Sequence, residues 1–264
     1  MRKWVRGCRG GYRLVRFLYD TRKEVNKING YVNTPKYDEK AAVCMRRWGR
    51  KTLKTLKVEV DADYSEPGRP VIYVCNHKSY LDGAVIASFT GSFFVIKQEA
   101  FSWPFLGKYI RRTRNIPVKR DEMKSRMQSG LQIKQRILNG NSVVVFAEGT
   151  TRLESGFSNP HNGVFKLSAK TGIPIVPLVL EYENPNDAWV GNASFLPHFV
   201  RTQGKPHTRV SFKSGPLLAS TEPEYLKHKT VQWIDFNAKQ MRSRYDLQLV
   251  SPVTQNRSGW AAAM

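Results

Sequence analysis

The sequence has few cysteines and no long apolar segment. Its 264 residues include only Cys8, Cys44 and Cys75, which form neither an even set nor a CxxC pair. We therefore expect neither a disulfide framework nor a zinc site, and a reducing compartment fits this composition best. No segment reaches the roughly 18 consecutive apolar residues that a membrane-spanning helix requires, so we expect no transmembrane helix.

Acidic residues are also scarce. The chain has 21 Asp and Glu residues against 43 Lys and Arg residues, which gives a net charge of +22. Such an excess indicates an anionic partner, which could be nucleic acid, a phospholipid surface or a phosphorylated substrate. The motifs GxSxG, GxxxxGK[ST] and GxGxxG do not occur. Their absence argues against a serine-elbow hydrolase, a P-loop nucleotidase and a dinucleotide-dependent enzyme.

The first residues can form a basic amphipathic helix. Apolar residues share one face of a helix over 2–19 and arginines share the opposite face: Trp4, Val5, Cys8, Tyr12, Val15, Leu18 and Tyr19 against Arg2, Arg6, Arg9, Arg13 and Arg16. Three glycines weaken this helix, so it should form on a supporting surface. That surface could be an anionic membrane or the protein's own core. A mitochondrial transit peptide fits less well, because no serine occurs before Ser65. A second basic helix is expected over 38–56.

Farther along the chain, apolar runs alternate with helical patterns. The runs lie at 71–75, 92–96, 116–118, 142–146, 175–180 and 208–213, and the helical patterns at 82–89, 124–138, 164–171 and 222–244. This alternation predicts an α/β fold, with a central mostly parallel mixed sheet and helices on both faces. We expect membrane-associating helices over 1–60, an α/β domain over 61–250 that opens with a loop at 61–69, and a disordered tail over 251–264.

Polar side chains follow four of the predicted strands. His77 follows the first strand, Lys97 the second, Arg120 the third, and Glu148 with Gly149 the fourth. Ligands of open α/β sheets bind outside the carboxyl ends of the strands. We therefore expect these residues to converge on one crevice. The remaining histidines show no metal-ligand spacing, so no metal site is expected.

His77 and Asp82 form a candidate base and carboxylate. A neutral imidazole can accept a proton from an alcohol if a carboxylate fixes its tautomer. Five residues of helix turn through about 500°, which would put the pair on different faces. His77 is therefore expected in the turn before the helix. The spacing from Ser79 to Asp82 also fits a capping box, so Asp82 could cap the helix, orient His77 or do both.

Four short blocks occur in order along the chain. They are NHKSYLD at 76–82, RNIPVKR at 114–120, FAEGTTR at 146–152 and IPIVPL at 173–178. The set resembles glycerolipid acyltransferases of the 1-acylglycerol-3-phosphate acyltransferase type. The first block resembles NHxSxxD, an instance of their HX4D signature, and the third resembles FPEGTxR with alanine in place of proline. The second departs from the family at Arg114 and Pro117, where glycine and phenylalanine are frequent.

The resemblance implies an O-acyltransferase in which His77 is the general base and Asp82 orients it. Such an enzyme moves a fatty acyl group from acyl-CoA or acyl carrier protein to the hydroxyl of a lysophospholipid, by direct attack and without a cofactor. The expected acceptor is 1-acylglycerol-3-phosphate and the product phosphatidic acid. We expect the acceptor to be bound by residues of the strand ends and the blocks: Lys97, Arg120, Glu148, Gly149, Thr150 and Arg152.

Two kinds of alternative remain open. The acceptor could be another lysophospholipid, a lyso-aminolipid or glycerol 3-phosphate, because the second block departs from the family pattern. The chain could instead be a non-catalytic basic protein that binds a membrane or nucleic acid. Its aromatic residues are not gathered in an RNA-recognition pattern, so no nucleic-acid partner is expected. We expect an enzyme held peripherally on the cytoplasmic face of an anionic membrane.

Overall fold

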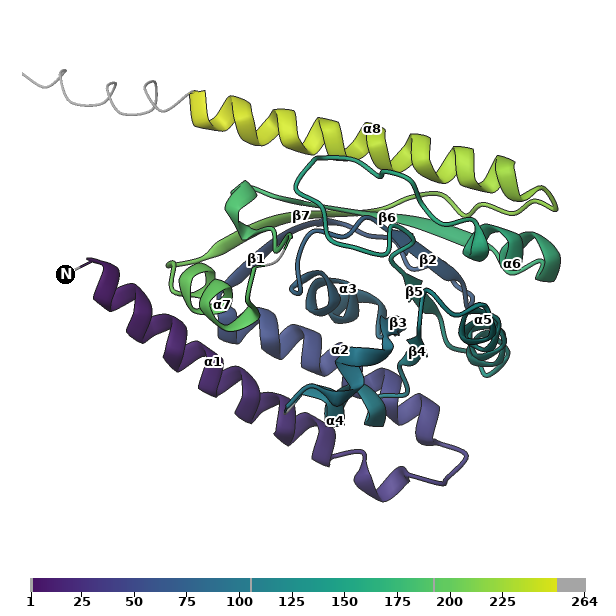
Figure 1. The fold of residues 1–264 in the computed structure, drawn as a ribbon, viewed down its shortest axis with the longest axis horizontal. Helices are drawn as coiled ribbons and strands as arrows, with labels where there is room; N and C mark the ends of the chain where they lie inside the picture. Colours follow the sequence, from purple (N-terminus) through teal and green to yellow (C-terminus); the bar gives the residue numbers. More distant parts are fainter. Residues whose placement is uncertain (1, 105, 192, 251–264) are drawn as a thin grey trace, which may run out of the picture.

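A computed structural model describes residues 2–104, 106–191 and 193–250. Within these residues a seven-stranded sheet, with the strand order β1-β7-β6-β2-β5-β3-β4, forms the centre of the molecule (Figure 1). The strands are β1 Val58–Asp63, β2 Ile72–Cys75, β3 Phe93–Lys97, β4 Ile116–Val118, β5 Val143–Val145, β6 Ile175–Tyr182 and β7 Thr208–Ser214. Neighbouring strands are parallel except for β6 and β7. The predicted mostly parallel mixed sheet is therefore confirmed.

Helices cover both faces of this sheet (Figure 1). They are α1 Arg2–Asn26, α2 Tyr37–Leu56, α3 Asp82–Thr90, α4 Leu106–Arg112, α5 Met123–Leu138, α6 Gly163–Thr171, α7 Phe195–Gln203 and α8 Pro223–Val250. In β2, Tyr73 and Cys75 pack into the core formed with α1, α2 and α3, whereas Ile72 and Val74 pack into the core formed with α6 and α8. Both faces of the central strands are therefore buried, as their continuous apolar runs predicted. Across the described ranges, no helix combines the length and apolarity needed to cross a bilayer.

The first strand was not predicted. The prediction of a loop over 61–69 is wrong at its start, because β1 continues to Asp63, and the expected domain boundary at residue 60 falls inside this strand. β1 pairs only with β7 at the edge of the sheet, and most of its residues are exposed. An edge strand of this kind lacks the apolar run that marked the central strands. The expected disordered tail over 251–264 lies outside the described residues.

The helix α1 packs on the core through a face that carries Gly10, Arg13 and Phe17. Arg13 is buried and its guanidinium donates hydrogen bonds to the backbone carbonyls of Gln203 at 2.6 Å and Pro206 at 2.9 Å. The face on which the sequence groups the arginines is therefore not uniformly exposed, because Arg13 is buried against the protein. Gly10 lets α1 approach α7 closely, since a Cβ at this position would lie 2.1 Å from the carbonyl oxygen of Val200.

The apolar stripe of α1 points away from the core. Trp4 is 75% exposed, Tyr12 70% and Val15 67%, and Tyr19 is exposed beside them. Soluble proteins seldom leave a contiguous apolar stripe uncovered unless another surface binds it. The sequence left open whether α1 docks on the protein or on a membrane. In the structure the face with Gly10, Arg13 and Phe17 docks on the protein, and the face with Trp4, Tyr12 and Val15 is exposed.

Asp38 at the start of α2 links three elements, and its replacement should give a pH-dependent loss of stability. Its carboxylate accepts hydrogen bonds from Arg114 Nε at 2.7 Å and Asn139 Nδ2 at 2.9 Å. Burial raises the pKa of Asp38, but the hydrogen bonds from Asn139 and Arg114 outweigh burial and hold the pKa below its ordinary value. A carboxyl group with a lowered folded-state pKa stabilises the fold above the unfolded-state pKa, and this stabilisation is lost as the pH falls through the folded-state value.

We therefore expect Asp38→Asn to lower the free energy of unfolding by about 1–3 kcal/mol at pH 7. The difference from the unsubstituted protein should shrink as the pH falls below about 4, where the carboxyl group of the unfolded chain is protonated. Urea unfolding at pH 7 and pH 3 measures both effects. Asp63→Asn is the matched control, because Asp63 forms only an exposed ion pair with Lys213 and should contribute less than about 1 kcal/mol. Equal losses at both pH values would contradict the assigned role of the Asp38 charge.

Candidate active site

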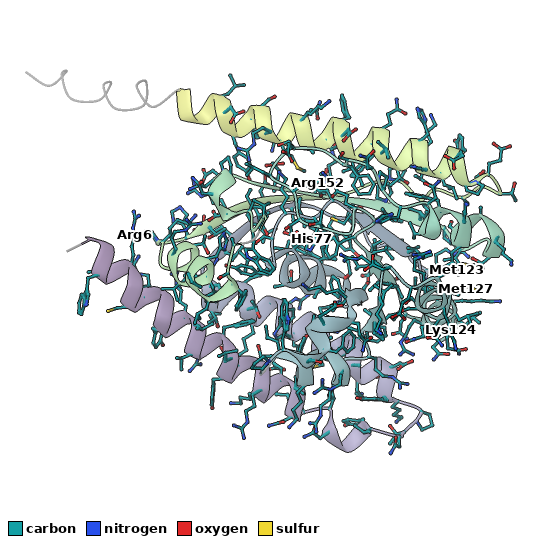
Figure 2. All side chains as sticks on the ribbon, viewed as in Figure 1. Arg6, His77, Met123, Lys124, Met127 and Arg152 are labelled. Atoms are coloured by element: carbon teal, nitrogen blue, oxygen red, sulfur yellow. The ribbon has the colours of Figure 1, made fainter. Side chains whose placement is uncertain are left out.

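His77 lies in the turn between β2 and α3, near the middle of the molecule (Figure 2). Its Nδ1 lies 2.8 Å from Oδ2 of Asp82, which is the first residue of α3. The expected placement of His77 before the helix is confirmed, and the turn brings the two side chains together. The imidazole also stacks on the ring of Phe146, with ring centroids 4.0 Å apart. Two contacts on different sides of the ring therefore fix its orientation.

The carboxylate of Asp82 is fully buried, and both of its oxygens accept hydrogen bonds. Its Oδ2 accepts hydrogen bonds from the backbone N–H groups of Lys78 at 2.7 Å and Ser79 at 2.9 Å, and its Oδ1 accepts one from the Tyr182 hydroxyl at 2.6 Å. Because Oδ2 acts as an acceptor, the Nδ1 of His77 carries the hydrogen of their contact. The unprotonated Nε2 is then left to accept a proton from a bound molecule.

Tyr182 was not identified from the sequence. Burial raises the pKa of Tyr182, and the neighbouring Asp82 charge raises it further, so the hydroxyl stays protonated and donates to Asp82. Tyr182 lies at the end of β6, and its side chain reaches Asp82 only because of the register between β6 and β2. No local sequence signal marks this contact.

The capping box predicted for Ser79 and Asp82 forms only in part. Asp82 does accept the Ser79 N–H, which is the carboxylate half of the motif. The Ser79 hydroxyl has no hydrogen-bond partner among the described residues, and α3 begins at Asp82 itself. The interpretation of Ser79 as a side-chain cap is therefore wrong. Asp82 is engaged with the turn and with His77 at the same time.

Glu148 fixes the backbone around His77. Its Oε2 accepts a hydrogen bond from the His77 N–H and its Oε1 accepts one from the Ser158 N–H, each at 3.0 Å. Arg152 lies 3.3 Å from the same carboxylate. Burial raises the pKa of Glu148, and the backbone hydrogen bonds from Ser158 and His77 partly offset this. The carboxylate of Glu148 therefore joins the turn at His77 to the backbone at Ser158. It is not among the groups that line the cavity.

Gly149 turns the chain toward the cavity. Its φ of +75° lies in the left-handed region, and a Cβ there would lie 3.2 Å from Nε2 of His161. The ring of His161 packs against this glycine. The glycine therefore permits both the turn after Glu148 and the close approach of His161.

A cavity of about 350 Å³ opens at the carboxyl ends of the parallel strands. Five of the predicted site residues line it, namely His77, Lys97, Arg120, Gly149 and Thr150. Asp82, Glu148 and Arg152 lie behind this lining. Of the residues predicted to converge from the strand ends, four line the cavity, namely His77, Lys97, Arg120 and Gly149, whereas Glu148 does not, so the prediction is wrong for Glu148. Thr150 also lines the cavity, and the substrate-binding roles of all these residues stay predictions.

The interior of the cavity is apolar. Aromatic and aliphatic side chains from α1, α2, α4, α7 and the strands form it: Phe17, Met45, Trp48, Leu56, Phe94, Ile96, Trp103, Leu106, Tyr109, Ile110, Phe146, Phe195 and Phe199. Cationic side chains stand at its rim, where Arg120 donates a hydrogen bond to the Gly149 carbonyl and Lys97 lies 5.2 Å from the centre of the Trp103 ring. His77 thus borders both a charged rim and an apolar interior. Within the described ranges, no group of three or more His, Cys, Asp or Glu side chains could hold a metal ion.

Comparisons with known proteins find similarity to acyltransferases. Residues 57–181 match the family model described as Acyltransferase. The chain is 28% identical over 141 residues to a 1-acyl-sn-glycerol-3-phosphate acyltransferase of Chlamydomonas reinhardtii, covering 53% of this chain and 40% of that protein. It is 28% identical over 175 residues to the lyso-ornithine lipid O-acyltransferase of Rhizobium meliloti, covering 59% of this chain and 60% of that protein.

A solved structure has the same fold. The crystal structure of the 1-acyl-sn-glycerophosphate (LPA) acyltransferase PlsC from Thermotoga maritima superimposes with a TM-score of 0.71 at 17% identity, covering 92% of this chain and 99% of that chain. The first curated relatives are longer, and this chain spans between 32% and 60% of their length. The family match contains His77, Asp82, Arg120 and Glu148 in their predicted order. The segment of residues 57–181 belongs to the acyltransferase family.

Proposed function

We propose that this protein is an O-acyltransferase that moves a fatty acyl group from a thioester donor to the hydroxyl of a lysophospholipid. The first candidate acceptor is 1-acylglycerol-3-phosphate, which would give phosphatidic acid. The observation that carries the proposal is the position of His77, which Asp82 orients between a cationic rim and an apolar cavity. A phosphate suits the rim and a hydrocarbon chain suits the interior. The names of the relatives support this substrate class.

The proposed reaction needs one base and no covalent enzyme intermediate. Nε2 of His77 takes the hydroxyl proton while the hydroxyl oxygen attacks the thioester carbonyl carbon. A carbon–oxygen bond forms, the carbon–sulfur bond breaks, and the departing thiolate takes the proton from the imidazolium. Asp82 stabilises the imidazolium between these steps. Arg120 and Lys97 would hold the phosphate, so that the hydroxyl and the thioester meet beside His77.

A transfer assay with several acceptors tests this function. The purified protein should release thiol from acyl-CoA, or from acyl carrier protein carrying an acyl group, only when a lysolipid acceptor is present. Glycerol 3-phosphate, lysophosphatidic acid and neutral lysolipids should be compared with each donor. Release of thiol without an acceptor would indicate a hydrolase. Absence of release with every donor and acceptor would refute the proposal.

A lyso-aminolipid is the second candidate acceptor. Three of the relatives are named lyso-ornithine lipid O-acyltransferases, from Rhizobium meliloti, Pseudomonas aeruginosa and Brucella abortus. Burial lowers the pKa of Arg120, and the nearby carboxylate of Glu99 partly offsets this by favouring the charged guanidinium. A carboxylate near Arg120 could pair with an ammonium group of the acceptor. A lyso-ornithine lipid therefore belongs in the acceptor panel, and a higher kcat/KM for it than for lysophosphatidic acid would favour this candidate.

We further propose that the exposed stripe of α1 attaches the enzyme to an anionic membrane. Tryptophan and tyrosine favour the membrane–water interface, and basic residues near an anionic surface each contribute about 1 kcal/mol. Tyr12→Glu combined with Val15→Glu should weaken binding to anionic vesicles strongly, because two carboxylates would have to enter the interface. Vesicle flotation at low and high salt measures this, and the unsubstituted protein should also bind less at high salt.

The matched control carries Phe236→Glu and Leu247→Glu, which place two carboxylates at exposed apolar positions of α8. That helix lies on the other side of the sheet from α1 (Figure 1). The control should bind vesicles as the unsubstituted protein does. Deletion of residues 1–20 should also weaken binding, but it removes Arg13 and Phe17 from the core and is the less selective test. Equal binding by both double variants would contradict attachment through α1.

A larger side chain at Gly83 should change the preferred acyl length. Gly83 lines the cavity in the first turn of α3, and a Cβ there would meet no atom within 4 Å. A Cβ therefore fits without moving the backbone, and we expect the rest of a leucine side chain to occupy part of the apolar space. We expect Gly83→Leu to lower kcat/KM for a palmitoyl donor by about tenfold or more and to spare an octanoyl donor. Gly130→Leu on α5, whose Cβ would meet only Leu167 at 4.0 Å, should leave the preference unchanged. An unaltered donor preference in Gly83→Leu would place the acyl chain elsewhere.

A further inference from the structure

Lys78, the residue after His77, has a buried ammonium group that joins three separate segments. Its side chain is 3% exposed, and its Nζ lies 3.1 Å from Oε2 of Glu181 at the end of β6. The same Nζ donates hydrogen bonds to the backbone carbonyls of Leu153 at 3.0 Å and Glu154 at 3.2 Å. The ammonium group of Lys78 thus connects the turn that carries His77, the end of β6 and the loop after Glu148.

Glu181 is also held from the C-terminal helix. Its other oxygen, Oε1, accepts a hydrogen bond from Arg242 of α8 at 2.5 Å, and Arg242 also donates to the carbonyls of Tyr182 and Glu183. Glu181 is 2% exposed and Arg242 17% exposed. We name Lys78, Glu181 and Arg242 the ion triad. It reaches from the turn that carries His77 to Arg242 of α8, which is more than 160 positions after Lys78 in the sequence.

The loop that Lys78 binds carries part of the cavity wall. Thr150 and Thr151 line the cavity, and the Arg152 N–H donates to the His77 carbonyl at 2.8 Å. On its far side the loop is fixed by the hydrogen bond from the Phe157 N–H to Asp235 at 2.6 Å. Between these two anchors, the carbonyls of residues 153 and 154 are bound by Lys78. Without the ammonium, two carbonyls of this loop would lose their donor.

Stability alone does not account for such a triad. Burying charges costs free energy, and well-packed apolar residues of similar volume are often equally stabilising or more so. What a buried ion triad does supply is a fixed arrangement of the groups that it joins. Here those groups are the turn that carries His77 and the loop that carries Thr150 and Arg152.

We propose that the ion triad is a positioning device that holds the loop of residues 150–154 against the His77 turn, and so shapes the acceptor side of the active site. This inference rests on the proposed function where acceptor binding is measured. The triad residues do not touch the substrate. Lys78 acts through the loop, Glu181 acts through Lys78, and Arg242 acts through Glu181.

Hydrogen exchange tests the positioning without any substrate. In Lys78→Met, the amides of Arg152, Phe157 and Ser158 should exchange faster than in the unsubstituted protein, because their loop has lost its central contact. Lys51→Met is the matched control, since it removes a lysine paired with the buried Asp20 between α1 and α2, away from the loop. The control should leave these three amides unchanged. Equal exchange rates in both variants would overturn the proposal.

Steady-state kinetics test the consequence for the acceptor. Lys78→Met should raise the KM for the lysolipid acceptor by about tenfold or more, with little change in the KM for the donor, because a displaced loop impairs acceptor positioning. The pH dependence of kcat should keep its shape, since the His77–Asp82 contact is untouched. A merely structural role would lower Tm and leave both KM values unchanged at temperatures far below Tm.

A second variant covers the case in which Lys78→Met does not fold. Arg242→Met removes the outer member of the ion triad, which is more exposed than Lys78, and should show the same two effects, each smaller. The proposal would be overturned if the loop amides exchanged faster but the KM for the acceptor did not change. It would equally be overturned if amide exchange in the loop did not change. If the unsubstituted protein transfers no acyl group, the proposed function fails, and the exchange rates alone decide whether the ion triad holds the loop.

Discussion

Replacement of His77 by alanine should reduce acyl transfer by roughly 10²- to 10⁴-fold, the usual contribution of a general base. The imidazole is the only group in the described residues that combines a position on the cavity with a hydrogen-bonded carboxylate partner. Without it, the hydroxyl of the acceptor must attack the thioester while still protonated. The effect should fall on kcat, with a small change in the KM for the acceptor, because the cationic rim at Arg120 remains.

The fold should survive this substitution. Asp82 keeps its hydrogen bonds from Lys78, Ser79 and Tyr182, so no buried charge is left without a partner. Circular dichroism and thermal unfolding check this point. His228→Ala, at an exposed position of α8, is the control and should transfer acyl groups at the full rate. A folded His77→Ala protein with full activity would refute the assigned base.

The central sheet could be predicted because its strands are buried on both faces. Runs such as 71–75 and 175–180 are apolar without interruption, and the glycine at 172 marks the end of a helix before the second of them. The edge strand β1 gave no such signal, because its sequence VEVDAD carries acidic residues on an exposed face. A strand that is buried on both faces leaves a continuous apolar run in the sequence, whereas an exposed edge strand leaves no such run.

The candidate site could be predicted only as far as strand order allows. Parallel strands bring their carboxyl ends to one edge, so five residues were expected together, namely His77, Lys97, Arg120, Glu148 and Gly149. The structure places all of them except Glu148 on one cavity. Tyr182 could not be foreseen in the same way. It reaches Asp82 across 100 positions of sequence, and a shift of one residue in the register of β6 would turn it to the other face of the sheet.

The apolar interior of the cavity could likewise not be predicted from the sequence. Its walls come from helices far apart along the chain, including Phe17 of α1, Trp48 of α2, Tyr109 of α4 and Phe199 of α7. Each of these residues looks like an ordinary core residue on its own helix. Their common property, a shared empty space, arises only from how the helices pack against one another.

Replacement of Asp82 by asparagine should lower kcat by roughly 10²-fold, less than the loss of His77 but with the same origin. The backbone N–H groups of Lys78 and Ser79 both point at the Oδ2 position, so they require an oxygen there and place the amide nitrogen at the Oδ1 position. The Tyr182 hydroxyl can accept a hydrogen bond from that nitrogen. The substituted side chain can therefore keep every contact and still accept the hydrogen on Nδ1 of His77.

What Asp82→Asn removes is the negative charge that stabilises the imidazolium during transfer. The loss should appear in kcat more than in the KM for either substrate, and the folded structure should be retained. Tyr182→Phe is the informative comparison, because it removes one hydrogen bond to Oδ1 and leaves the charge in place, so its effect on kcat should be the smaller of the two. If Tyr182→Phe proved as damaging as Asp82→Asn, the orientation of the carboxylate, and not its charge, would be what His77 requires.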